Sequence, residues 1–139
     1  MTHRQRFAAV LGALVVAMVA GFAAPVLAAR QPLAMLDEVE SGRWELRMRD
    51  PAGAVERICM RDARRLIQMR HPFDNCERLI VNDTPTDVTV QYTCRGRGYG
   101  RTHIRRESNR LLQVDSQGIA EGLPFAFVAE ARRIGDCPG

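Results

Sequence analysis

Apolar and polar residues alternate along much of this chain, and such alternation is typical of strands with one buried face. In segment 43–49, Trp44, Leu46 and Met48 fall on one side, and arginine and glutamate fall on the other. Similar segments recur at close spacing with turn residues between them. They predict about seven strands, at 43–49, 55–60, 79–81, 88–94, 99–106, 111–116 and 125–133. Such a series favours an antiparallel meander.

Clusters of Asp, Asn, Pro and Gly mark turns between these strands. The clearest are at 50–53, 82–86 and 122–124. Two short segments have helical spacing instead, one at 33–40 and one that follows Asp62, a helix N-cap residue, and runs to Met69. The expected fold is mainly β, α+β at most: an antiparallel meander of about six to seven strands, curled over a core, with one short helix packed on it.

The start of the chain has the three-part order of a secretory signal. A short basic stretch precedes an uncharged, almost wholly apolar run at 7–24, and small residues follow. We therefore expect a helical signal peptide at 1–29, cut after Ala28 or Ala29, and one disulfide-stabilised β-rich domain at 30–139. The expected location is the periplasm. The alternative is a retained signal that anchors the protein in the inner membrane, because the apolar run approaches the length of a membrane span.

Composition and charge exclude some classes of protein. The chain has 139 residues, 46% of them apolar, which suits one globular domain and is too apolar for a disordered chain. Its 20 basic residues, all arginine, outnumber 16 acidic ones, so the formal charge is +4. Cleavage of the signal removes Arg4 and Arg6 and leaves 18 basic residues against 16 acidic, a charge of +2. The electrostatic support for a nucleic-acid partner disappears with that change.

Four cysteines follow the signal: Cys59, Cys76, Cys94 and Cys137. An even number of cysteines in a small exported domain predicts disulfides, because an oxidising compartment lets thiols pair. The chain holds no C-x-x-C, and the spacings of 17, 18 and 43 residues are not those of a zinc or thioredoxin-like site. Three connectivities are possible. We favour Cys59–Cys76, which would close over the short helix, with Cys94–Cys137, which would tie the chain end to the sheet.

Short motifs near both ends of the mature chain resemble a known family. A Gly-Arg-Trp-Glu sequence at 42–45 follows the signal, three spaced cysteines come next, and Ile-Gly-Asp-Cys-Pro at 134–138 closes the chain. This arrangement is similar to the small secreted bacterial proteins of domain-of-unknown-function family 3617. That family has no assigned activity. The resemblance therefore implies export and disulfides, and it carries over no catalytic residue.

The most unusual local feature is segment 95–101, in which arginine and tyrosine alternate with glycine. Glycine lets the backbone approach a bound anion, and arginine offers a planar pair of donors to phosphate, sulfate or carboxylate. Arg101, His103 and Arg105 would share one face of the strand that follows, with Arg97 in the loop before it. These four residues are the predicted binding site for an anionic glycan, lipid headgroup or phosphate. The structural alternative is a glycine-rich turn into an exposed strand that arginine keeps soluble.

No motif for catalysis, a cofactor or a metal stands out in the chain. No serine lies in Gly-x-Ser-x-Gly, and His71 and His103, the histidines left after cleavage, lack a second histidine at ligand spacing. We expect no cofactor, no metal site and no catalysis, but a cell-envelope binding or interaction module with an anionic ligand or a protein partner. One alternative is a small periplasmic enzyme, marked by a pocket that holds either histidine near an acidic residue with shifted titration. The other is a signal-anchored accessory protein.

Overall fold

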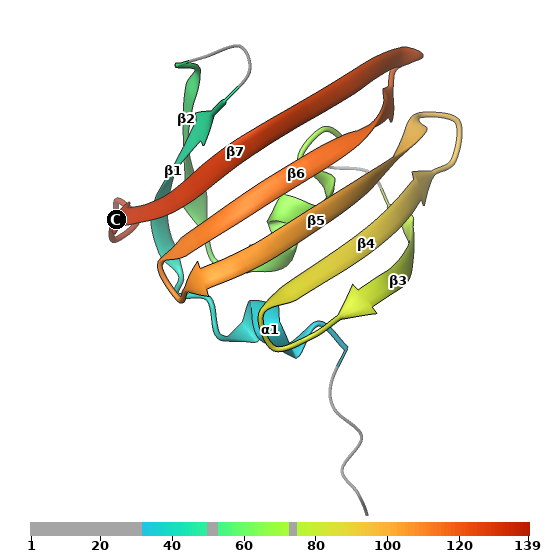
Figure 1. Ribbon diagram of the computed structural model, residues 1–139. Coiled ribbons are helices and arrows are strands. Elements are labelled where there is room, and N and C mark those ends of the chain that lie inside the picture. Colours follow the sequence, from blue (N-terminus) through green and yellow to red (C-terminus); the bar gives the residue numbers. More distant parts are fainter. Residues whose placement is uncertain (1–31, 50–52, 73–74) are drawn as a thin grey trace, which may run out of the picture.

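The computed structural model describes residues 32–49, 53–72 and 75–139, which form one sheet of seven antiparallel strands (Figure 1). The mainly β prediction is confirmed. The strands are β1 (Gly42–Met48), β2 (Val55–Met60), β3 (Glu77–Asp83), β4 (Asp87–Cys94), β5 (Gly98–Ser108), β6 (Leu111–Ala120) and β7 (Leu123–Gly135). Two short helices are α1 (Ala34–Asp37) and the 3₁₀ helix η1 (Ala63–Gln68). The predicted signal peptide and most of the predicted turn at 50–53 lie outside the described residues.

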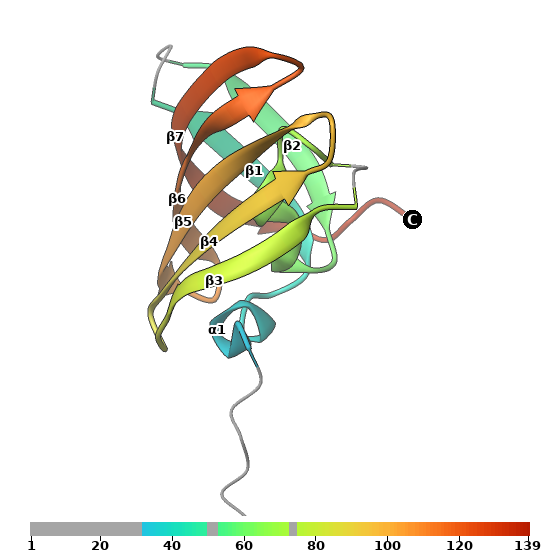
Figure 2. The ribbon, with the colours of Figure 1, turned by 90° about the vertical axis from the view of Figure 1, so that its right-hand side faces the viewer.

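The strands follow the order β2-β1-β7-β6-β5-β4-β3 across the sheet. The run from β3 to β7 is a meander, and the β1–β2 hairpin extends it because β1 pairs with β7. After β2 the chain passes through η1 and enters β3 at the opposite edge. The sheet is strongly curled, so it has a concave face, on which η1 packs, and a convex face (Figure 2).

The concave face carries the core. Trp44 on β1 has no exposed surface, and the side chains that surround it from other strands are equally buried. The buried set includes Leu46, Val88, Val90, Tyr92, Ile104, Leu112, Val114, Ala129 and Ala131 from the strands, Leu66 and Ile67 from η1, and Met35 and Leu36 from α1. Successive side chains of a strand point to opposite faces. The same strands therefore leave most of their polar residues on the convex face.

The short helix η1 forms where the sequence predicts it. Asp62 has an extended backbone, and its carboxylate accepts a hydrogen bond from the Arg64 N–H at 2.9 Å, as an N-cap residue does. Ala63, Leu66 and Ile67 are buried against the sheet. The helix is of the tighter 3₁₀ type and ends at Gln68.

All four cysteines form disulfides, but the favoured pairing is wrong. Cys59 is joined to Cys137, and Cys76 to Cys94. The reason is the path of η1, which leads the chain from one edge of the sheet to the other and so separates Cys59 on β2 from Cys76 beside β3. The C-terminal segment meets β2 instead, because Arg43 of β1 lies opposite both Cys59 and Gly135.

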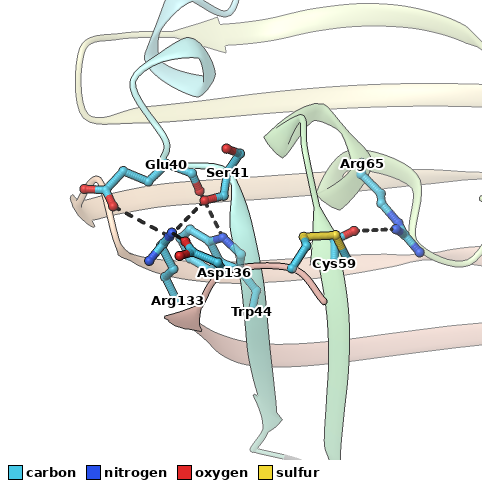
Figure 3. The surroundings of a disulfide bond; sticks show 8 residues. Glu40, Ser41, Trp44, Cys59, Arg65, Arg133 and Asp136 are labelled. Carbon is cyan, nitrogen blue, oxygen red and sulfur yellow. Dashed lines mark hydrogen bonds and ion pairs between the residues drawn. A yellow bond between two sulfur atoms is a disulfide. The ribbon is translucent and has the colours of Figure 1, made fainter. Parts of the chain in front are cut away.

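Arg133 connects the segment before β1 with the segment after β7, near the Cys59–Cys137 disulfide (Figure 3). Its Nε donates to the Ser41 carbonyl oxygen at 2.8 Å, and its Nη2 donates to the Asp136 carboxylate. The indole N–H of Trp44 donates to the Glu40 carbonyl oxygen at 3.0 Å in the same region. These contacts hold the start of β1 to the end of β7, so this cluster has a structural role.

The turn predicted at 122–124 lies at 121–122, so the two ranges share only Gly122. Ala120 lies opposite Leu123, so the β6–β7 hairpin turns on Glu121 and Gly122 alone. Both have positive φ, 53° and 79°, which is the backbone of a type I′ turn. Pro124 consequently lies near the start of β7, where proline is tolerated.

The two disulfides favour an oxidising compartment outside the cytoplasm. Within the part of the chain that the structure describes, no helix has the length and apolar character needed to cross a membrane. Export through a cleaved signal stays a prediction.

Candidate functional site

The convex face of β5 brings three of the four predicted site residues together. Arg101, His103 and Arg105 point outward, and they alternate with residues that are buried on the concave side. Arg97 lies in the turn between β4 and β5, outside this row. The backbone alternation of β5 is sufficient to place the three side chains on one face.

Three of these four residues already have a partner. His103 Nε2 lies 3.5 Å from Asp87 Oδ1, Arg105 Nη2 lies 2.8 Å from Glu107 Oε1, and Arg97 Nη1 lies 3.7 Å from Glu121 Oε1. Arg101 differs from them. Among the described residues, its guanidinium makes no side-chain hydrogen bond and no ion pair. An incoming anion therefore meets a free guanidinium at Arg101 and competes with a carboxylate at the other three.

Two glutamines flank Arg101. The strand register places Arg101 opposite Gln91 on β4 and opposite Gln117 on β6. Residues directly opposite in an antiparallel sheet have Cβ atoms about 4.5–5.5 Å apart. Neither glutamine side chain forms a hydrogen bond within the described ranges. Arg101 and its neighbours thus form a row of polar groups that the fold leaves without partners.

A hollow of about 400 Å³ lies over this row. Its walls combine the polar row with Tyr99, whose residue surface is 52% exposed, and with the start of β7. The lining residues are Gln91, Tyr99, Gly100, Arg101, Gln117, Gly118, Pro124, Phe125 and Ala126. We call it the Arg101 hollow. Its volume is within the range of small-molecule sites.

A pair of glycines forms the floor of the Arg101 hollow. Gly100 and Gly118 are directly opposite each other on β5 and β6. A Cβ atom at Gly118 would collide with the Tyr99 carbonyl, and one at Gly100 would collide with the Tyr92 side chain beneath the sheet. Glycine is therefore needed here for the close approach of the two strands and for the packing of Tyr92.

Tyr92 and His71 are buried under this floor. Tyr92 Oη lies 3.3 Å from His71 Nδ1, and His71 Nε2 lies 3.1 Å from the Arg97 carbonyl oxygen. Burial raises the pKa of Tyr92 to about 12, so the phenol keeps its proton at neutral pH. Both ring nitrogens of His71 are engaged in these contacts. His71 thus supports the turn that precedes β5.

His103 lies in a second, smaller hollow of about 180 Å³ next to the Arg101 hollow. Asp87 is beside it, and Asp115 is directly opposite it on β6. Hydrogen bonds from Thr84, and also from Thr86 and His103, hold the pKa of Asp87 below its usual value despite the opposing effect of desolvation. A histidine paired with a carboxylate is a competent proton acceptor. No hydroxyl or thiol of the described residues is hydrogen-bonded to His103.

Two larger hollows are less suited to an anion. One, of about 440 Å³, lies beside the Cys76–Cys94 disulfide, where Glu77 and Arg95 offer opposite charges. The other, of about 430 Å³, is lined by Arg133 and Asp136, whose charges are already paired with each other. Across residues 32–49, 53–72 and 75–139, no group of three or more His, Cys, Asp or Glu side chains is placed to hold a metal ion.

The predicted site missed the residues that complete the hollow. Gln91 and Gln117 were not expected in it, because the sequence does not reveal which positions of different strands lie opposite one another. Tyr99 was also missed, although it lies two residues before Arg101 on β5 and therefore shares its face. The available signal was weak: each of the three occupies an outward position of an alternating strand.

Comparison of this chain with protein-family models, with curated proteins and with solved structures finds no match. The resemblance to domain-of-unknown-function family 3617 therefore stays a prediction from the motifs.

Proposed function

We propose that this protein is an exported, non-catalytic binding module of the cell envelope, and that it takes an anionic ligand on its convex face at Arg101. The observation that carries the proposal is the free guanidinium of Arg101, which lines a hollow of about 400 Å³. Arg101 and the two glutamines beside it are exposed and have no partner among the described residues, so their hydrogen-bonding groups are open to a ligand.

Charge and chemistry favour an anion over a cation. Among the residues that the structure describes, no acidic side chain lines the Arg101 hollow. Arginine presents donors in a planar fork that matches a carboxylate or a phosphate, and it stays protonated at every physiological pH.

Export is the second part of the proposal. The signal-like residues 1–29, the two disulfides and the motifs similar to domain-of-unknown-function family 3617 all support a periplasmic protein. An intact mass from the native host, with and without reduction and alkylation, tests it. We expect a species that begins at Ala29 or Arg30 and takes up alkylating groups only after reduction. A full-length species with free thiols would contradict export.

Binding is tested with small anions and one matched control. The purified protein is titrated with acetate, inorganic phosphate, sulfate and phosphatidylglycerol vesicles, and the amide NMR signals of Gly100 and Gly118 report on the floor of the hollow. We expect at least one anion to shift them, and Arg101→Ala to abolish the shift. Arg43→Ala is the control, since Arg43 is also exposed and unpaired among the described residues but lies on β1, away from the hollow. If no anion acts, or if both variants behave alike, the proposal is wrong.

A further inference from the structure

The Arg101 hollow has an apolar wall in addition to its charge. Tyr99 stands at its rim on β5, with its aromatic ring half exposed, and Pro124 and Ala126 border it from β7. An isolated exposed tyrosine is common, but this one borders the same hollow as a free arginine. Aromatic side chains combine a large apolar face with low conformational entropy, and they are favoured where a ligand has an apolar face of its own. A bare inorganic anion would make no use of this wall.

The two glutamines specify a ligand that both donates and accepts hydrogen bonds. A glutamine amide offers two N–H donors and a carbonyl acceptor. Gln91 and Gln117 lie on either side of Arg101, so their amides face the ligand from two strands. Hydroxyl groups also donate and accept, and a ring with several hydroxyls matches a pair of amides better than an acyl chain or a simple anion does.

Arg101 limits the charge of the ligand. Counted over the described part of the chain, the lining of the hollow has one cationic side chain and no anionic one. One guanidinium binds one carboxylate with two parallel hydrogen bonds. A phosphate monoester carries nearly two charges at neutral pH, so a second positive group would be needed to neutralise it. A single carboxylate fits the charge of the hollow best.

We propose that the Arg101 hollow is a subsite for an acidic sugar: a pyranose ring whose apolar face packs on Tyr99, whose hydroxyls meet Gln91 and Gln117, and whose carboxylate meets Arg101. This inference rests on the proposed function and names the class of its ligand. Two sources of such a ring are an N-acetylmuramic acid unit of cell-wall glycan and a uronic acid unit of an envelope polysaccharide. Both carry one carboxylate on a pyranose.

The test compares sugars that carry a carboxylate with neutral counterparts that lack it. The protein is titrated with glucuronic acid against glucose, with N-acetylmuramic acid against N-acetylglucosamine, and with acetate as an acid without a ring. Binding is measured from the shifts of the Gly100 and Gly118 amides. We expect at least one acidic sugar to bind about tenfold or more tightly than its neutral counterpart and than acetate, because only the acidic sugar combines a charged hydrogen bond to Arg101 with contacts of the ring. The acidic sugar that binds more tightly identifies the source.

Variants assign each contact. Tyr99→Ala should strongly weaken the binding of the acidic sugar and leave the binding of acetate unchanged. Arg101→Ala should remove the difference in affinity between acidic and neutral sugars. Gln117→Ala should weaken the binding of acidic and neutral sugars alike, and Arg43→Ala should leave the affinity for every sugar unchanged. Because these side chains are exposed, an unchanged thermal transition is expected for each variant and shows that the fold is intact.

The sugar inference and the proposed function fail differently. If acetate, phosphate or anionic vesicles bind at Arg101 as tightly as the acidic sugars, and Tyr99→Ala has no effect, the sugar inference is overturned and anion binding stands. If no anion binds and no sugar binds, both are overturned.

Discussion

The two faces of the curled sheet are made by the same strands and differ in how their polar groups are used. On the concave face of β5, the Thr102 hydroxyl lies 2.5 Å from the Ile67 carbonyl oxygen and 2.7 Å from Ser116 Oγ, so these buried hydroxyls have partners. On the convex face of the same strand, Arg101 has no partner among the described residues. The concave face thus stabilises the fold, and the convex face keeps polar groups available.

This difference separates stability from binding within single strands. Neighbouring residues of β5 belong to different faces, so one substitution tests packing and the next tests recognition. Buried polar groups must be paired, because an unpaired one costs about 1–3 kcal/mol. Exposed ones are under no such constraint. Matched substitutions on the two faces therefore test whether packing and recognition are separate.

The largest expected effect on the free energy of unfolding comes from the removal of a disulfide. Replacing Cys59 and Cys137 by serine opens a loop with a sequence separation of 78, whereas replacing Cys76 and Cys94 opens one of 18. Loop-closure entropy predicts losses of about 4.5 and about 3.2 kcal/mol in the free energy of unfolding. Chemical denaturation measures both. A greater loss from the shorter loop would contradict the entropic account.

Next in size is the comparison of one aromatic residue from each face. Trp44→Ala should lower the free energy of unfolding by about 3–5 kcal/mol, because a fully buried indole is replaced by a cavity. Tyr99→Ala, on the convex face, should change it by no more than about 0.5 kcal/mol. Urea denaturation of both variants measures the difference. Similar losses would show that the convex face also carries packing energy.

A smaller effect is expected where the two faces meet at the glycine floor. Gly100→Ala places a methyl group against the buried Tyr92 ring, and overpacking of this kind costs about 1–3 kcal/mol. The control is Gln117→Ala on the convex side of β6, which should leave the free energy of unfolding within about 0.5 kcal/mol. Thermal denaturation compares the two. Full stability of Gly100→Ala would mean that Tyr92 moves aside easily.

The smallest expected effect is a pH dependence that belongs to the convex side. Thr84 above all, with Thr86 and His103, lowers the pKa of Asp87 in the folded protein. A lowered folded pKa gives stability that is present above the unfolded pKa, near 4, and is lost as the pH falls through the folded pKa. The Asp87→Asn variant should therefore lose less stability than the wild type on acidification below about pH 4. Parallel acid titrations followed by circular dichroism test this, and identical curves would refute it.

Local features of the fold could be predicted from the sequence. The alternation around Trp44 predicts β1 and its buried side. The helix η1 is predicted by the N-cap residue Asp62 and by the apolar residues Leu66 and Ile67. Both predictions work because strand and helix periods are properties of residues close together in the chain. The Cys59–Cys76 pairing failed because it assumed that the chain returns to the same edge after η1. The sequence contains no local signal for that crossing, since it depends on which distant strands pair.

The sequence by itself determined a mainly β domain, four cysteines suited to disulfides, and an outward row of Arg101, His103 and Arg105. Only the tertiary structure decided that β1 pairs with β7, which cysteines join, and that Gln91 and Gln117 flank Arg101 while ion pairs occupy its neighbours. The physical reason is the range of the interactions. Side-chain alternation repeats every two residues within a strand, whereas register and strand order come from hydrogen-bond ladders and core packing between segments far apart in the chain.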